Sequence, residues 1–259
     1  MTGAREDIPC APEAQGLYSD DTLMRAIVGP FRRFSSLIVS NVYLLDGGPG
    51  DRWLIDSGHW TERWQLLREL RATGLRPSEI SGVLLTHRHS DHAGNAAFLQ
   101  REFGLRVMAH RADAEVLDGT SPRPVMGTRG TALERLLCAV ENRFPSALRV
   151  DRALEDGDTE AGLEVHLVPG HTDGSVFYRH ASTGCLLTGD TLLTARPPLT
   201  IFRDVMPAYD AFSTDTARSH ASLAAFHALG VRYDHVLAGH GKPLVGNARD
   251  RVMRALQKL

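Results

Sequence analysis

Residues 86–95 read THRHSDHAGN, directly after a short apolar run that is typical of a strand. Residues two apart in an extended chain point the same way, so His87 and His89 can offer two imidazoles to one metal ion. Asp91 and His92 fall where a helix begins, and the change in chain direction can aim them at a second ion nearby. Imidazole nitrogen and carboxylate oxygen are ligands suited to zinc, iron and related metals.

Three further candidate ligands lie downstream, each beside a glycine at the carboxyl end of an apolar run. They are His171 after 163–168, Asp190 after 185–188 and His240 after 236–238. Active sites of α/β folds gather at strand ends, where glycine lets the backbone turn tightly. Asp56, after 53–55, has the same kind of position. One histidine-rich stretch alone is compatible with a polar surface loop, but the repeated placement favours a metal site.

Strand-like and helix-like segments alternate along all 259 residues. Apolar runs predict strands at 37–45, 53–55, 83–85, 107–109, 163–168, 176–179, 185–188 and 236–238. Helical spacing predicts helices at 61–72, 93–103, 111–117, 131–143, 209–229 and 247–256. No Ser-, Gly- or Pro-rich linker separates the two halves. The sequence therefore predicts a single α/β domain over 1–259, with the weakly patterned residues 1–35 as an N-terminal arm or lid.

Composition limits the function classes. The 29 basic and 31 acidic residues nearly balance, and no basic stripe suggests nucleic acid. Three widely spaced cysteines, Cys10, Cys138 and Cys185, suit a reducing compartment. The first residues lack the apolar core of a secretory signal, and no stretch approaches the roughly 18 apolar residues of a membrane span. We therefore expect a cytoplasmic protein that binds neither nucleic acid nor membrane.

The motifs together resemble the metallo-β-lactamase fold superfamily. They are LIDSG at 54–58, THRHSDHAGN at 86–95, PGHTDGS at 169–175, TGDT at 188–191 and GHG at 239–241. The resemblance covers nearly the whole chain, and the order and spacing of the motifs make it specific. It implies an α/β fold of four layers, an αβ/βα sandwich, with the metals at one edge of the two sheets.

The resemblance also implies two divalent metal ions, with zinc expected and iron or manganese as alternatives. The implied ligands divide into those of the first ion, those of the second and a bridging carboxylate: His87, His89 and His171; Asp91, His92 and His240; and Asp190. By the same resemblance, Asp56 supports the histidine-bearing loop from behind. Such supporting carboxylates orient ligating histidines and tune their basicity.

The resemblance favours a binuclear metallo-hydrolase that uses a metal-bound hydroxide to cleave an ester, thioester or lactone bond of a small molecule. Asp91 and Asp190 are its candidate catalytic residues, with Asp91 placed to take or relay a proton. Antibiotic-degrading β-lactamases of the fold usually have Cys where Asp190 stands. Hydroxyacylglutathione hydrolases use a helical extension for glutathione, whereas only 247–259 follow the last motif here.

An oxidative alternative remains open. Persulfide dioxygenases resemble the same pattern and use a single iron, held by the residues that match His87, His171 and Asp190. For the substrate wall, the sequence offers the loop 194–208 with Arg196, since loops on a rigid scaffold usually carry specificity. Residues 1–35 and 119–146 are candidates for a homodimer interface.

Overall fold

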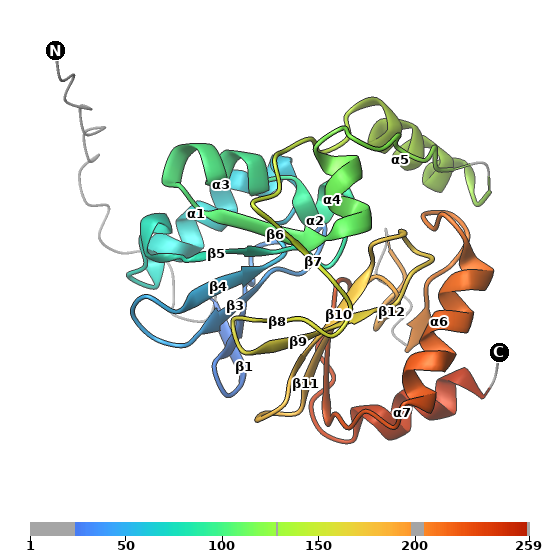
Figure 1. The fold of residues 1–259 in the computed structure, drawn as a ribbon. Helices are drawn as coiled ribbons and strands as arrows, with labels where there is room; N and C mark the ends of the chain where they lie inside the picture. Colours follow the sequence, from blue (N-terminus) through green and yellow to red (C-terminus); the bar gives the residue numbers. More distant parts are fainter. Residues whose placement is uncertain (1–23, 128, 198–204, 258–259) are drawn as a thin grey trace, which may run out of the picture.

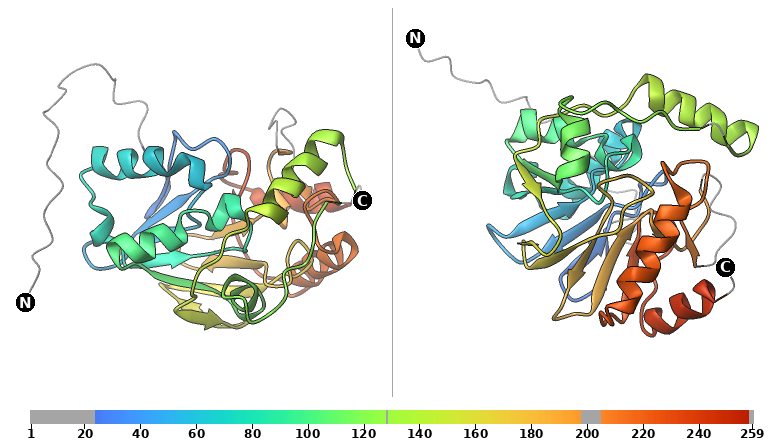
Figure 2. Two further views of the ribbon diagram at one scale, coloured as in Figure 1. Left: turned by 90° about the horizontal axis from the view of Figure 1, so that it is seen from above. Right: turned by 45° about the vertical axis from the view of Figure 1, so that its right-hand side comes forward.

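The fold is built on two β-sheets that lie face to face, with helices on the outer face of each (Figure 1). This computed structural model describes residues 24–127, 129–197 and 205–257. Figure 2 shows the same order of layers from two further directions. Helix, sheet, sheet and helix form the four-layer αβ/βα sandwich that the motifs predict.

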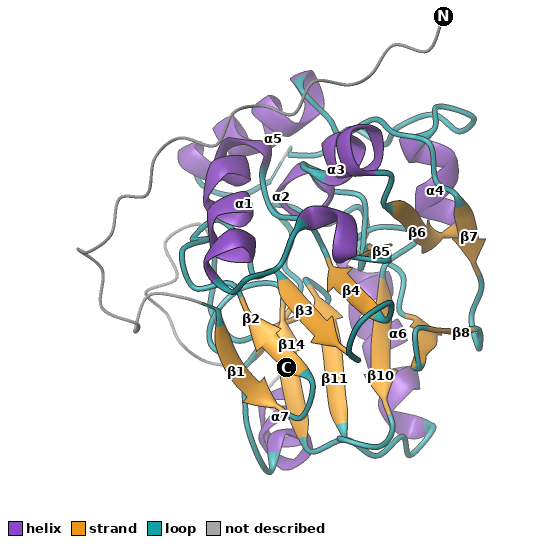
Figure 3. Cartoon of the chain, turned by 90° about the vertical axis from the view of Figure 1, so that its left-hand side faces the viewer, coloured by secondary structure: helices purple, strands orange, loops and turns teal. Residues whose placement is uncertain are grey.

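The first sheet has seven strands in sequence order, antiparallel from β1 to β4 and parallel from β4 to β7. These strands are β1 (Arg25–Val28), β2 (Phe31–Arg33), β3 (Tyr43–Asp46), β4 (Arg52–Ile55), β5 (Gly82–Leu84), β6 (Arg106–His110) and β7 (Arg152–Leu154). The helices on this side are α1 (Arg63–Ala72), α2 (Ser90–Ala93), α3 (Ala96–Phe103) and α4 (Arg111–Leu117), which Figure 3 shows from the β1–β4 side. Helix α5 (Ala132–Arg143) stands apart from them, at the rim of the molecule.

The second sheet has the strand order β14-β11-β10-β9-β8, and only its β11–β14 pair is parallel among the described strands. Its strands are β8 (Thr159–Glu160), β9 (Leu163–Leu167), β10 (Val176–His180), β11 (Cys185–Gly189) and β14 (His235–Ala238). Helices α6 (Thr216–Ala228) and α7 (Ala248–Leu256) cover its outer face (Figure 1). A small ladder joins β12 (Leu192–Leu193) to β13 (Met206–Pro207).

Side chains alternate between the two faces of each strand, and this alternation creates three apolar cores between the four layers. In β4, Leu54 packs toward the helices of the first sheet, while Trp53 and Ile55 pack toward the second sheet. In β10, Tyr178 lies between the sheets, and Phe177 packs outward against α6. Successive side chains on a strand point to opposite faces, so strands that are apolar throughout are covered on both sides.

The predicted strand at 37–45 is shorter in the structure, where β3 begins at Tyr43. The apolar residues before it are irregular because carboxylates, not a neighbouring strand, take up their backbone N–H groups. Glu62 accepts from the N–H groups of Ile38, at 2.7 Å, and of Val39, at 3.2 Å. Periodicity cannot reveal this arrangement, since it depends on a side chain from a distant segment.

The helix predicted at 93–103 is divided into α2 and α3 by Gly94 and Asn95. A Cβ atom on Gly94 would lie 2.3 Å from the Ser90 carbonyl oxygen and 2.7 Å from the Trp60 nitrogen, so the close approach requires glycine. The helix predicted at 209–229 begins only at Thr216, where the Asp215 side chain accepts from the Arg218 N–H. Aspartate is a preferred residue at this position.

Residues 25–33 belong to β1 and β2 of the first sheet, whereas the sequence places them in an arm or lid. The rest of that predicted arm, 1–23, lies outside the described residues. Strands β7 and β8 also escaped prediction, because two or three residues are too few to show alternation. Across the described segments, we find no helix with the length and apolar character needed to cross a bilayer.

Candidate metal centre

The predicted ligands gather at one end of the two sheets, where strand ends from both sheets meet. His87 and His89 follow β5, and Asp91 and His92 lie on the short helix α2. The three ligands from the second sheet follow β9, β11 and β14, and they are His171, Asp190 and His240. The structure thus brings all seven predicted ligands into two adjoining groups of donor atoms.

The first group consists of three buried histidines, His87, His89 and His171. The His171 Nε2 atom lies 3.2 Å from the His87 Nε2 atom and 3.0 Å from the His89 Nδ1 atom. Burial lowers the pKa of His87 and His89 well below the usual value, and it lowers the pKa of His171 to about 4. Neutral imidazoles that converge in this way are the form in which histidine binds metal.

The second group consists of Asp91, His92, Asp190 and His240. The His240 Nε2 atom lies 3.1 Å from an oxygen of Asp91 and 3.1 Å from an oxygen of Asp190. The His92 Nε2 atom lies 3.3 Å from the other Asp190 oxygen.

These contacts control the charges of the second group. Burial opposes the charge on Asp190, but His240 and His92 outweigh it and hold the pKa of this carboxyl well below its usual range. Burial also opposes protonation of His240, yet Asp190 and Asp91 raise the pKa of His240 to about 9. A divalent ion bound here would therefore displace protons from histidines that the carboxylates otherwise keep charged.

Asp190 connects the two groups. One of its oxygens lies 3.1 Å from the His240 Nε2 atom of the second group and 3.9 Å from the His171 Nε2 atom of the first. Gly239 makes room for this carboxylate, since a Cβ atom there would lie 2.2 Å from an Asp190 oxygen.

Asp56 supports the site from behind, as the resemblance implies. One carboxylate oxygen lies 2.7 Å from the His92 Nδ1 atom, on the side of the ring away from Asp190. The other oxygen accepts the backbone N–H of Thr86 at 2.8 Å. Asp56 has a φ of 62°, a left-handed conformation that aspartate tolerates better than most residues. It fixes the ring of His92 and the start of the ligand loop together.

A second buried carboxylate, which the sequence did not reveal, joins the two histidine loops. Asp113 on α4 accepts the backbone N–H of Arg88 at 2.9 Å, and its oxygen lies 3.4 Å from the Arg88 guanidinium. It also accepts the Thr172 hydroxyl at 2.7 Å and the Gly174 N–H at 3.2 Å. Arg88 separates His87 from His89 in the sequence, so Asp113 ties their loop to the loop of His171. Only the three-dimensional fold reveals this role, because 111–117 has the pattern of an ordinary helix.

The chemistry of the donor set fits divalent metal ions. Within the described chain, the buried His89 Nε2 atom has no hydrogen-bond partner, and the buried His92 Nε2 and Asp190 Oδ1 atoms lie 3.3 Å apart without the geometry of a hydrogen bond. A buried polar atom left unpaired costs about 1–3 kcal/mol. Converging imidazole nitrogens and carboxylate oxygens that cannot satisfy one another by hydrogen bonding are suited to a cation.

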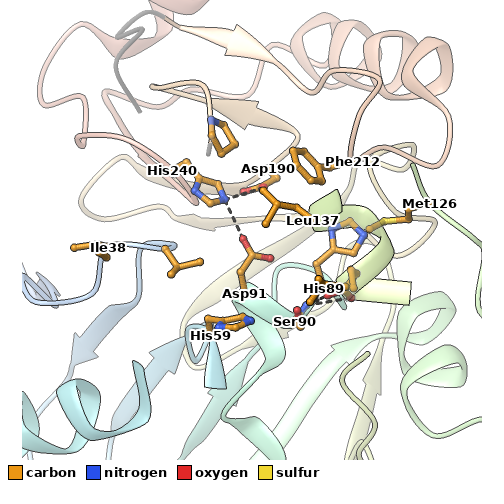
Figure 4. A pocket seen from close by; sticks show the side chains of 14 residues that line it. Ile38, His59, His89, Ser90, Asp91, Met126, Leu137, Asp190, Phe212 and His240 are labelled. Carbon is orange, nitrogen blue, oxygen red and sulfur yellow. Dashed lines mark hydrogen bonds and ion pairs between the residues drawn. The ribbon is translucent and has the colours of Figure 1, made fainter. Parts of the chain in front are cut away.

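A cavity of about 350 Å³ opens directly over the centre. Figure 4 shows His89, Asp91, Asp190 and His240 among the side chains that line it. The remaining wall is largely apolar and comes from five places in the chain: Ile38 and Val39; Met126; Leu137 and Val140 of α5; Pro197; and Phe212. The sequence did not mark α5 or the segment before β3 as parts of the site.

The predicted substrate wall at 194–208 is only partly found. Pro197 lines the cavity over the centre, whereas Arg196 and Met206 line a neighbouring hollow. The Arg196 guanidinium lies 3.1 Å from a Glu134 oxygen and stacks over the Tyr209 ring. Arg196 therefore does not line the cavity over the centre, and its contact with a substrate stays a prediction. Residues 198–204 lie outside the described part of the chain.

Comparison with known proteins gives the family. A family model for the metallo-beta-lactamase superfamily matches residues 36–236. The chain belongs to this superfamily. Strands β3 to β13 and all of the donor residues except His240 fall within the matched span. The resemblance carried by the motifs and the predicted fold class are thereby confirmed.

Two relatives that the chain matches are described as hydrolases. The probable metallo-hydrolase YybB of Bacillus subtilis is 30% identical over 173 residues, which cover 67% of this chain and 68% of that protein. The hydroxyacylglutathione hydrolase of Anaeromyxobacter dehalogenans is 37% identical over 153 residues, which cover 59% of this chain and 46% of that enzyme. The chain thus spans less than half the length of this second relative.

A solved structure supports the same assignment. The crystal structure of TTHA1623 in a di-iron-bound form superposes with a TM-score of 0.61 at 26% identity, and the match covers 91% of this chain and 99% of that one. The chain is therefore a member of a metallo-hydrolase superfamily with a histidine and aspartate site suited to divalent metal.

Proposed function

We propose that this superfamily member is a binuclear metallo-hydrolase that cleaves an ester, thioester or lactone bond of a small molecule. In this proposal, His87, His89 and His171 hold one ion. Asp91, His92 and His240 hold the second, and Asp190 bridges the two. Zinc is the proposed metal, and the di-iron form of TTHA1623 makes iron the first alternative to test.

The observation that carries the proposal is the position of Asp190 between two complete groups of donors. A single oxygen of this carboxylate lies within 3.9 Å of His171 and 3.1 Å of His240. The competing assignment, sulfur oxygenation by one iron on His87, His171 and Asp190, gives no role to the buried histidines of the second group. A hydrolase that uses two ions employs every donor in the centre.

Bound divalent ions would supply Lewis acidity, which polarises a carbonyl oxygen and lowers the pKa of a water molecule toward about 7. The protein supplies position and proton transfer. Asp91 is suited to move a proton because it lines the cavity and its side chain is 26% exposed, the largest exposure among the carboxylates of the centre. Asp56 and Asp113 hold the ligand loops rigid, so that the donors keep their geometry during the reaction.

A panel of esters, thioesters and lactones tests this proposal in metal-loaded protein. Hydrolysis should disappear on chelation and return when metal is restored. The variant Asp190→Ala should lose bound metal and hydrolysis together. A matched control is Asp173→Ala, since Asp173 lies two residues after His171 but pairs with Arg218 at 2.6 Å on the surface. Full metal content and turnover in Asp190→Ala would overturn the bridging role.

A further inference from the structure

Helix α5 carries its apolar stripe on the outside. Leu133, Leu137, Val140 and Phe144 recur at the helical period and are 36–59% exposed, with Leu136 beside them at 60%. Amphipathic helices normally turn such a face toward the core. In α5 the apolar stripe faces away from the core instead. Two of its residues, Leu137 and Val140, line the cavity over the metal centre.

Polar contacts beside the stripe hold α5 in this orientation. Buried Glu134 pairs with Arg196 at 3.1 Å and completes a capping box with Thr131. Glu141 accepts the backbone N–H of Ser90, which lies next to the ligand Asp91, at 3.2 Å. Because its polar face is bound to the body of the protein, the helix presents its apolar face to the cavity as a fixed wall.

The character of the cavity restricts what it can hold. Leu137 and Val140 share the lining of the cavity with a second apolar segment, Ile38 and Val39. In Figure 4, the Asp91 and His240 side chains lie between Ile38 and Leu137. Exposed apolar side chains gathered around convergent polar groups are typical of a ligand site.

Charge restricts the occupant further. Among the described residues, no lysine or arginine lines this cavity, whereas the carboxyl groups of Asp91, Glu141 and Asp190 do. Away from the metal donors, a carboxylate at the far end of a chain that lies against α5 would approach the carboxyl group of Glu141 and find no lysine or arginine of the lining to pair with. Burying an unpaired charge is strongly unfavourable.

We infer that the acyl group of the substrate is an uncharged, apolar chain that lies against Leu137 and Val140 of α5, with its carbonyl end at the donors of the metal centre. This inference rests on the proposed hydrolase function and assigns its substrate class. It also distinguishes the chain from an enzyme that recognises an anionic acyl group.

The test is the chain-length dependence of hydrolysis for thioesters of N-acetylcysteamine, from acetyl to decanoyl. Each buried methylene contributes about 0.8 kcal/mol, so kcat/KM should rise roughly three- to fourfold per methylene until the cavity is filled. A glutaryl thioester should react at least about tenfold more slowly than the pentanoyl one. A flat or falling series, with hydrolysis present, would overturn the acyl site and leave the hydrolase intact.

Matched variants on α5 assign the effect to the cavity wall. Leu137→Gln keeps a helix-forming residue of similar size but removes the apolar surface, so it should flatten the chain-length series. Leu136→Gln makes the same change on the same helix outside the cavity lining, and it should leave the series unchanged. Equal effects of the two variants would contradict the inference.

A binding measurement separates this inference from the proposed reaction. Linear 2-alkanones from butanone to decanone carry a carbonyl and an alkyl chain but no bond to cleave. Their Kd, measured by calorimetry, should fall about threefold per methylene and rise again in Leu137→Gln. If these ketones bind in this way while no thioester, ester or lactone is cleaved, the acyl site stands and the proposed reaction is wrong. Binding independent of chain length would overturn the acyl site.

Discussion

Replacing Asp113 by asparagine should lower both the stability of the protein and its affinity for metal, although Asp113 is not one of the proposed metal ligands. The carboxylate is 1% exposed and faces the Arg88 guanidinium, which is also 1% exposed. Burial raises the pKa of Asp113, while Arg88 and the hydrogen bond from Thr172 act in the opposite direction. In Asp113→Asn, the guanidinium loses its buried counter-charge. The amide oxygen can accept the backbone N–H of Arg88 or that of Gly174 but not both, because the other position is an NH2 donor.

The expected loss in the free energy of unfolding is large. Breaking a buried ion pair by removing one partner costs about 3–5 kcal/mol, and native domains have only about 5–15 kcal/mol of stability in total. Asp113→Asn should therefore lower the free energy of unfolding by about 3 kcal/mol or more in metal-free protein. Displaced ligand loops should also weaken metal binding roughly 10–100-fold, as loss of an orienting partner does at other metal sites.

Denaturant unfolding in excess chelator measures the first effect, and competition with a chromogenic chelator measures the second. Arg88→Met combined with Asp113→Asn removes both charges, so the double variant should be more stable than the sum of the two single changes by about 2 kcal/mol. The surface control Asp173→Asn should change stability by no more than about 0.5 kcal/mol. A loss below about 1 kcal/mol in Asp113→Asn, with unchanged metal affinity, would refute this reasoning.

Three further outcomes follow from the same contacts. Asp56→Asn keeps a residue that tolerates the left-handed backbone but removes the charge beside His92, so metal affinity in a chelator competition should fall roughly 10–100-fold. Thr131→Ala removes the cap of α5 and should cost about 1 kcal/mol, which hydrogen exchange would detect as faster exchange along that helix only. Chelation should lower the melting temperature, because an ion present at 100 times its Kd stabilises the folded state by about 2.7 kcal/mol; an unchanged melting temperature would contradict metal binding to the folded chain.

Three of the predicted ligands come together because each lies at the carboxyl end of an apolar strand and beside a glycine. His171, Asp190 and His240 are far apart in the chain, yet the carboxyl ends of neighbouring strands meet at one edge. Long elements with clear periodicity, such as α1 and α5, were also predicted within a few residues.

Features that depend on contacts between distant segments could not be predicted. Nothing local indicates that Asp113 joins two loops, that Glu62 accepts the backbone of 38–39, or that Glu134 engages Arg196. The reversed face of α5 is the clearest case, since its apolar spacing correctly predicted a helix but could not show that the stripe faces the cavity. The homodimer interface at 1–35 and 119–146 and the cytoplasmic location stay predictions.

The metal content of the purified, untagged chain tests the central claim most directly. Elemental analysis of the wild type should find close to two equivalents of zinc, or of zinc and iron together, per chain, and chelator competition should show that Asp190→Ala binds both ions more weakly. One equivalent of iron in fully active protein, with His240→Ala unaffected in metal content, would contradict the binuclear centre.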